Sequence, residues 1–80
     1  MNCVYLLRSL GNPTKTYVGL TEDVTARLAK HNAGEVPSTS RFKPWMLVAY
    51  IAVPSRERAT ALERYLKSGS GHAFAHRHLW

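Results

Sequence analysis

The stretch CVYLLRSLGNPTKTYVGL, residues 3–20, decides the fold expected for this chain. Its two ends, residues 3–8 and 15–20, are short runs rich in β-branched and aromatic residues, which favour strands. The Gly-Asn-Pro sequence of residues 11–13 lies between them and is typical of a turn or short loop. We therefore predict a β-hairpin over this stretch.

A first helix is predicted over residues 22–33, directly after the hairpin. Thr21 offers an N-cap hydroxyl, and Glu22 and Asp23 place negative charge in the first turn, where it suits the helix dipole. Gly34 follows the predicted helix, and glycine commonly ends helices because it adopts the left-handed conformation readily.

Residues 35–44 predict a polar loop that carries Arg41 and Lys43. The run WMLVAYIAV that follows, residues 45–53, is almost entirely apolar and too short for most helices. Such a run favours a strand buried on both faces, so we expect it to be the central strand or to lie under a helix.

A second helix is predicted over RERATALERYLK, residues 56–67, after the N-cap candidate Ser55. Its apolar positions recur at helical spacing: Ala59, Leu62 and Leu66. The sequence Ser-Gly-Ser-Gly at 68–71 predicts the end of this helix. The remaining residues, 72–80, predict either one short helical turn or a loosely docked tail.

The expected order is therefore strand, strand, helix, strand, helix within a single domain over residues 1–80. It indicates an α/β fold of the α+β type: a small three-stranded, mainly antiparallel sheet flanked by helices, with a short C-terminal tail or helix. The chain lacks the strand-helix alternation of a doubly wound sheet and a glycine-rich phosphate loop. The absence of both features excludes the common nucleotide-binding folds.

The net charge is +6, from 11 Lys and Arg against 5 Asp and Glu. A basic surface attracts polyanions, nucleic acid first, although many small domains are basic for solubility alone. Cys3 is the one cysteine, so no intramolecular disulfide forms, which favours a reducing compartment. No apolar run approaches the roughly 20 residues of a membrane span, and we expect a cytoplasmic protein with no membrane partner.

Two charged or polar residues lie on or beside the apolar stripe of the first predicted helix. His31 shares the stripe with Val24 and Leu28, and Arg27, four residues before His31, lies at its border. In the simpler interpretation Arg27 extends to the solvent and His31 is a hydrogen-bonded core residue. The functional interpretation places both in a site.

The second helix has the same anomaly with the opposite sign, because Glu63 lies close to its apolar stripe. Glu63 could simply pair with Lys67 four residues later, or it could face a cleft shared with Arg27 and His31. On the hairpin, Tyr5 and Tyr17 share a sheet face only in some registers. Buried tyrosines are usually core residues.

Gly19 is less ordinary, because glycine inside a strand usually marks a bulge or a close backbone approach. Together with the features above it gives the chain a resemblance to the GIY-YIG nuclease family. Val4-Tyr5 after Cys3 and Tyr17-Val18-Gly19 stand at the family's two tripeptides, Cys3 taking the place of the first glycine. The other matching positions are Arg27 and His31, Lys43-Pro44-Trp45, and Glu63.

The resemblance runs from residue 3 to residue 71 and implies a small stand-alone bacterial nuclease, similar to the domains of excision-repair and homing endonucleases. It implies metal-dependent hydrolysis of phosphodiester bonds in nucleic acid, with DNA the expected substrate. Glu63 would then be the single carboxylate that holds Mg²⁺ or Mn²⁺, which takes its other ligands from water and phosphate. A larger protein partner for targeting is compatible with so short a chain.

The remaining residues supply the other parts of such a reaction. Arg27 would bind the scissile phosphate through its forked guanidinium. Tyr5 is our choice of general base, with Tyr17 the alternative, provided that Arg27 and the metal lower the tyrosine pKa. His31 would contact the phosphate or orient a tyrosine. Further expected nucleic-acid contacts are Lys30, Arg41, Lys43 and Lys67.

Two rival interpretations compete with the nuclease. One is a nucleic-acid-binding module that retained the fold and has little activity. The other is a metal site in the C-terminal segment built from His72, His76 and His78, which has no cysteine or acidic partner nearby in the sequence.

Overall fold

The computed structural model describes all 80 residues and contains one three-stranded sheet. The hairpin is confirmed, with β1 (Asn2–Ser9) antiparallel to β2 (Thr16–Thr21). The third strand, β3 (Trp45–Val53), pairs antiparallel with the other side of β1. The strand order is therefore β2-β1-β3, and the fold is of the α+β type, as predicted.

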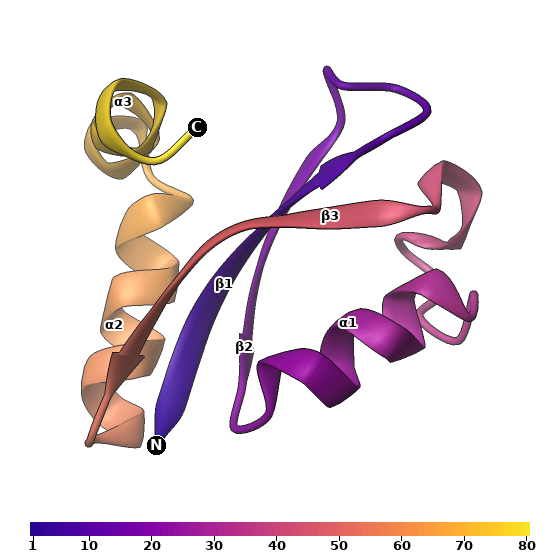
Figure 1. Ribbon diagram of the computed structural model, residues 1–80. Helices are drawn as coiled ribbons and strands as arrows, with labels where there is room; N and C mark the ends of the chain where they lie inside the picture. The colour runs from indigo at the N-terminus through magenta and orange to yellow at the C-terminus, as the bar shows by residue number, and fades with distance from the viewer.

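Helices cover both faces of the sheet (Figure 1). Helix α1 (Val24–Asn32) lies on one side, and α2 (Arg56–Leu66) and α3 (Gly69–His78) lie on the other. A short 3₁₀ turn, η1 (Ser40–Phe42), precedes β3. None of the helices is long and apolar enough to span a bilayer.

Alternation along β1 divides the core into two clusters. Val4 and Leu6 face α2 and α3, where they pack with Ala59, Leu66 and Ala75. Tyr5 and Leu7 face α1 and pack with Trp45. Because successive side chains of a strand point to opposite faces, one strand supplies both cores.

The start of α1 differs from the prediction. Asp23, and not Thr21, is the N-cap, since its side chain accepts a hydrogen bond from the Ala26 amide at 3.0 Å. The Thr21 hydroxyl instead accepts a hydrogen bond from the Asp23 amide, before the helix starts. The helix begins at Val24, and its first turn holds no acidic residue. Threonine and aspartate both cap helices well, so residue type alone does not determine which of the two is the N-cap.

α1 ends at Asn32, and Gly34 follows its C-cap Ala33 and stops the helix, as predicted. The Gly34 φ of +78° is the left-handed conformation that favours glycine. The Glu35 amide donates to the Lys30 carbonyl and the Gly34 amide to the His31 carbonyl, which is the Schellman pattern.

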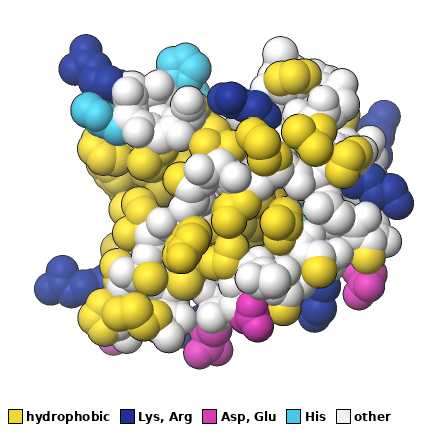
Figure 2. All heavy atoms as spheres, in the orientation of Figure 1, with side chains coloured by type: hydrophobic (Ala, Val, Ile, Leu, Met, Phe, Trp, Pro, Cys, Tyr) yellow, Lys and Arg dark blue, Asp and Glu magenta, His cyan; other side chains and the backbone are white.

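The prediction that 45–53 is buried on both faces is wrong. β3 is an edge strand, and its Met46 and Tyr50 side chains are exposed. Figure 2, in the orientation of Figure 1, shows hydrophobic side chains across the middle of the molecule. The central, fully covered strand is β1, which is shorter but has neighbours on both sides.

The C-terminal segment is a helix, and it is longer than the single helical turn expected. Ser68–Gly71 ends α2 and immediately starts α3, a helix of ten residues. Ser68 is its N-cap, accepting from the Gly71 amide, and Gly71 lies against the backbone of Tyr65. Sequence propensity alone underestimates this helix because a close helix-helix contact stabilises it.

Candidate active site

The two hairpin tyrosines lie on the same face of the sheet. Tyr5 pairs with Gly19 and Leu7 pairs with Tyr17, so both tyrosines face α1. Their ring centroids are 6.1 Å apart. A Cβ on Gly19 would lie 2.4 Å from the Tyr5 hydroxyl oxygen, so the absence of a side chain at Gly19 lets the Tyr5 ring cross β2.

The Tyr5 hydroxyl contacts two side chains of α1. It lies 2.8 Å from His31 Nε2 and 3.3 Å from Arg27 Nε, which donates to it. These residues are one helical turn apart, which puts both above the same point of the sheet. The structure therefore brings Tyr5, Arg27 and His31 together from β1 and α1, and we call these three residues the tyrosine cluster.

His31 is held on its other side by Thr39. Its Nδ1 lies 2.7 Å from Thr39 Oγ1, and the Thr39 hydroxyl donates to the Val36 carbonyl at 3.3 Å. His31 is fully buried and Thr39 is 1% exposed. A threonine hydroxyl has one hydrogen, so with that hydrogen on Val36 the His31 Nδ1 must be the donor to Thr39.

This assignment leaves His31 Nε2 as an acceptor. The Tyr5 hydroxyl then donates to Nε2 and accepts from Arg27. The hydrogens on the Thr39 hydroxyl, the His31 ring and the Tyr5 hydroxyl therefore all have a partner. Burial lowers the pKa of His31, and the positive charge of Arg27 lowers it further. The imidazole is therefore neutral at pH 7.

The expectation that cations lower the pKa of Tyr5 is not met by the protein alone. Burial is the largest effect and raises this pKa, because it outweighs the hydrogen bond from Arg27. The same hydrogen bond raises the pKa of Arg27, which stays charged. Tyr5 therefore rests in its protonated form.

Tyr17 is half-buried at the outer edge of β2. Its ring lies 5.0 Å from the His31 ring and 6.5 Å from that of Trp45, measured between centroids. It thus borders the same cluster but is more open to solvent than Tyr5.

Glu63 comes from α2, on the other side of the sheet. After burial and the charge of Tyr17, the negative charge of Glu63 is the smallest of the effects that raise the pKa of Tyr5. No hydrogen bond or ion pair joins Glu63 to any of the three residues of the tyrosine cluster. Glu63 forms the pair with Lys67, 3.4 Å from Glu63 Oε2 to the Lys67 amine, with Lys67 54% exposed and Glu63 24% exposed. The pair occupies one carboxylate oxygen and is open to water.

The donor set at Glu63 fits a hard cation held by one carboxylate. No three His, Cys, Asp or Glu side chains are grouped to hold a metal, so no chelating cage exists. Mg²⁺ and Mn²⁺ do not need one, because Mg²⁺ keeps several waters and binds through one or two carboxylates plus substrate phosphate. His72 and His76 stack with centroids 6.1 Å apart, yet they also lack a third ligand.

The expected phosphate contacts lie in different places. Lys30 borders a pocket at the β2 edge together with Arg27. Arg41 in η1 and Lys43 just after it are exposed and line none of the pockets. The Arg41 guanidinium carbon lies 5.9 Å from the centroid of the Phe42 ring. Only the first of these three cations borders the same pocket as a residue of the tyrosine cluster.

Two structurally important residues were not identified from the sequence. Thr39 fixes the His31 ring, and Asn32 joins α1 to β3 by bonding both the amide and the carbonyl of Trp45. Neither belongs to an apolar pattern. Their polarity in or beside predicted loops was the only signal.

Known proteins share the sequence pattern and the fold of this domain. The sequence model of the GIY-YIG catalytic domain matches residues 1–74. Two relatives are structure-specific endonuclease subunits SLX1, from Candida dubliniensis (36% identical over 95% of this chain) and Talaromyces stipitatus (40% over 76%). The chain spans only 28% and 17% of those two proteins.

A solved structure shares the fold. The solution NMR structure of the UPF0213 protein BH0048 from Bacillus halodurans is 33% identical, with a TM-score of 0.55 over 96% of this chain and 84% of that one. Fold and sequence together define a catalytic domain of the nuclease class. The chain belongs to the GIY-YIG family.

Proposed function

We propose that this domain is a metal-dependent endonuclease that hydrolyses phosphodiester bonds, with DNA as substrate. The observation that carries the proposal is a buried series of hydrogen bonds from Thr39 through His31 to the Tyr5 hydroxyl. The Arg27 guanidinium donates to the same hydroxyl. A merely structural core has no need for a tyrosine, an arginine and an imidazole at one point.

In this proposal Tyr5 acts as a relay. It accepts a proton from the attacking water while its own proton moves to His31 Nε2, 2.8 Å away. A concerted transfer needs no free phenolate, which agrees with the raised pKa of Tyr5. Neutral His31 can accept the proton, and Thr39 keeps its ring in the required tautomer.

Arg27 would hold the scissile phosphate with the guanidinium nitrogens that do not bind Tyr5. Glu63 would hold Mg²⁺ or Mn²⁺, which when bound neutralises phosphate charge and stabilises the leaving oxygen. Tyr17, at the open side of the cluster, would contact the water or the phosphate. The alternative of Tyr17 as the base stays open to test.

A larger protein partner is part of the proposal. It is supported by the name of the SLX1 relatives, which are subunits, and by the small share of them that this chain spans. The partner would supply targeting to the substrate.

Single-turnover cleavage of plasmid DNA under saturating Mg²⁺ tests the function. We expect Glu63→Gln to abolish cleavage while metal-free DNA affinity is kept, because a carboxamide has no charge to hold the cation. Tyr5→Phe should slow cleavage by about a hundred-fold or more. Glu57→Gln is the matched control, an exposed glutamate in the first turn of the same helix, and should cut at the wild-type rate.

Cleavage by Glu63→Gln at the wild-type rate would refute the role of this carboxylate. If the wild-type chain binds DNA but cuts none, with either metal, the binding-module interpretation replaces the nuclease. If Tyr17→Phe loses more rate than Tyr5→Phe, the base is Tyr17.

A further inference from the structure

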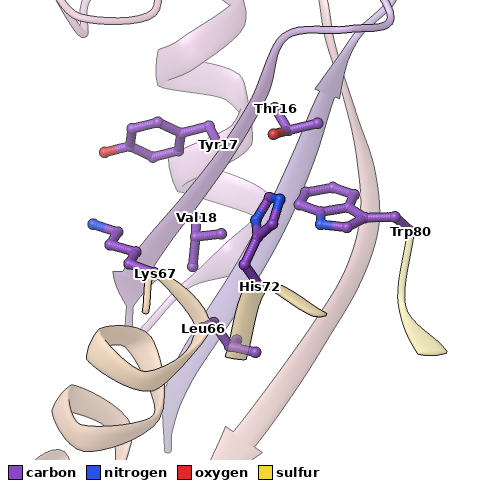
Figure 3. Close-up of a pocket in the computed structure, with 7 residues that line it drawn as sticks. All are labelled: Thr16, Tyr17, Val18, Leu66, Lys67, His72 and Trp80. Carbon is purple, nitrogen blue, oxygen red and sulfur yellow. The ribbon is translucent and has the colours of Figure 1, made fainter. Parts of the chain in front are cut away.

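A pocket of about 350 Å³ opens at the outer edge of β2, next to the tyrosine cluster (Figure 3). Its walls come from β2, the end of α2, α3 and the C-terminal residue. The lining residues are Thr16, Tyr17, Val18, Leu66, Lys67, His72 and Trp80. Tyr17 therefore borders both the tyrosine cluster and this pocket.

A second pocket, of about 230 Å³, continues the first toward the hairpin loop. The two share Thr16, His72 and Trp80, and the second adds Arg8 and His76. We call the two together the β2–α3 groove. It leads away from the cluster along the free edge of the sheet.

The groove combines aromatic rings with positive charge. None of its lining residues is Asp or Glu, whereas Lys67 and Arg8 both line it. The Arg8 guanidinium carbon lies 5.5 Å from the Trp80 ring centroid. The Nε atom of Arg8 is buried without a hydrogen-bond partner, and no carboxylate side chain forms an ion pair with Arg8. The groove thus offers a held indole ring beside an unneutralised cation.

We propose that the β2–α3 groove is a subsite for one unpaired nucleotide of the substrate strand. Its base would stack on the indole of Trp80 and the exposed imidazole of His72, and its phosphate would lie near Lys67 and Arg8. Aromatic rings and cations interleaved along a groove are how proteins hold single strands, since every base offers a flat face. The proposal rests on the function proposed above.

An unpaired base is required because a base inside a duplex is covered by its neighbours and cannot present its face to a side chain. The position of the groove also matters. Tyr17 borders both sites, so in this proposal one strand would place a nucleotide in the groove and a nearby phosphate at Arg27.

Binding without metal tests the subsite separately from catalysis. The probes are a short oligothymidylate and an abasic strand of equal length, which have the same phosphates and differ only in bases. We expect about ten-fold tighter binding of the oligothymidylate, the effect of one stacking contact. Tryptophan emission should fall only with that strand, and the signal reports Trp80 because Trp45 is 4% exposed.

Substitutions on α3 supply the controls. His72→Ala should remove most of the preference for the oligothymidylate, and the change leaves the fold intact because this side chain is exposed. His78→Ala is the matched control, since His78 is exposed on the same helix but lines a different pocket with Phe74. It should keep the full preference.

Equal affinity for the two strands, or equal losses in the two variants, would overturn the subsite. Neither result would affect the nuclease proposal, which plasmid cleavage tests. A chain that prefers the oligothymidylate but cuts no DNA would support the subsite and contradict the nuclease.

Discussion

Tyr5 is held by two side chains of α1 and fits over a glycine of β2. His31 and Arg27 bind its hydroxyl from α1, and Gly19 leaves space for its ring across β2. With 1% of its surface exposed, the ring has one available position. A group fixed in this way loses little entropy when it acts on a substrate.

Gly19→Ala tests this arrangement. The new methyl would lie 2.4 Å from the Tyr5 hydroxyl oxygen, so the ring must move and the bonds to His31 and Arg27 must lengthen. We expect cleavage to fall by at least ten-fold, with a stability loss of about 1–3 kcal/mol. Single-turnover kinetics and chemical denaturation measure the two effects.

The control for that change is Gly11→Ala, where nothing lies within 4 Å of the added methyl. It should leave both rate and stability nearly unchanged. If Gly19→Ala cleaves at the wild-type rate, the Tyr5 position is not required for activity.

His31 should make folding stability depend on pH. Its pKa is lowered in the folded chain, chiefly by burial, so below the unfolded value of about 6.5 the unfolded chain binds a proton that the folded one does not. The free energy of unfolding therefore falls as pH falls through this range. Chemical denaturation of wild type and His31→Gln across pH 7.5 to 5 (roughly the range around that value) should show the slope weakened in the variant.

The comparison variant for pH is His78→Gln, which changes an exposed histidine on α3. It should keep the wild-type slope. A slope that survives unchanged in His31→Gln would mean that other groups cause the acid destabilisation.

At the scale of elements, α2 and α3 are in close backbone contact at Gly71. Ser68 caps α3 and also donates to the Tyr65 carbonyl at 2.6 Å, which fixes the turn between the helices. At Gly71 the backbone of α3 meets that of α2, and Ala75, one turn later, is buried against the core. Small residues therefore position the helix that forms one wall of the β2–α3 groove.

Gly71→Ala should separate the two helices. Its methyl would overlap the Tyr65 carbonyl oxygen, at 1.7 Å, and backbone cannot rotate aside as a side chain can. We expect a loss of more than about 2 kcal/mol of stability and of the oligothymidylate preference. Gly69→Ala, with nothing within 4 Å, should change stability by less than about 1 kcal/mol.

Denaturation curves and circular dichroism distinguish these outcomes. Equal stability of the two glycine variants would contradict the close helix-helix contact.

At the scale of the whole molecule, the sheet separates the two parts of the site. Tyr5, Arg27 and His31 lie on the α1 face, whereas Glu63 and Lys67 come from α2 on the opposite face. Tyr17 of β2 and Lys67 line one pocket, and β2 is an edge strand with no further strand beyond it. A substrate would thus lie along this edge.

The charge of +6 should make duplex binding depend strongly on salt. For roughly four phosphate contacts, affinity should fall about a hundred-fold between about 50 and 200 mM salt, measured by fluorescence anisotropy. Lys30→Ala should reduce the slope of log affinity against log salt by the amount expected for about one phosphate contact. Arg56→Ala, which borders a separate pocket on α2, should not, and a flat salt dependence in the wild type would refute phosphate-led binding.

Local features of the sequence were sufficient for much of the fold. The hairpin, the Ser55 cap of α2 and the end of α1 before Gly34 each depend on neighbouring residues, and each is found as predicted. The position of Arg27 and His31 on an inward helix face was also readable, because it follows from the helical period.

Contacts between distant segments decided the rest. An apolar run cannot show how many neighbouring strands it has. β3, expected to be the central strand or to lie under a helix, is an edge strand, and β1 is central. The start of α3 depends on packing against Tyr65, and the orientation of His31 depends on Thr39, eight residues away across a loop. The raised pKa of Tyr5 arises only when folding removes its hydroxyl from water, because desolvation is a property of the surroundings and not of the residue.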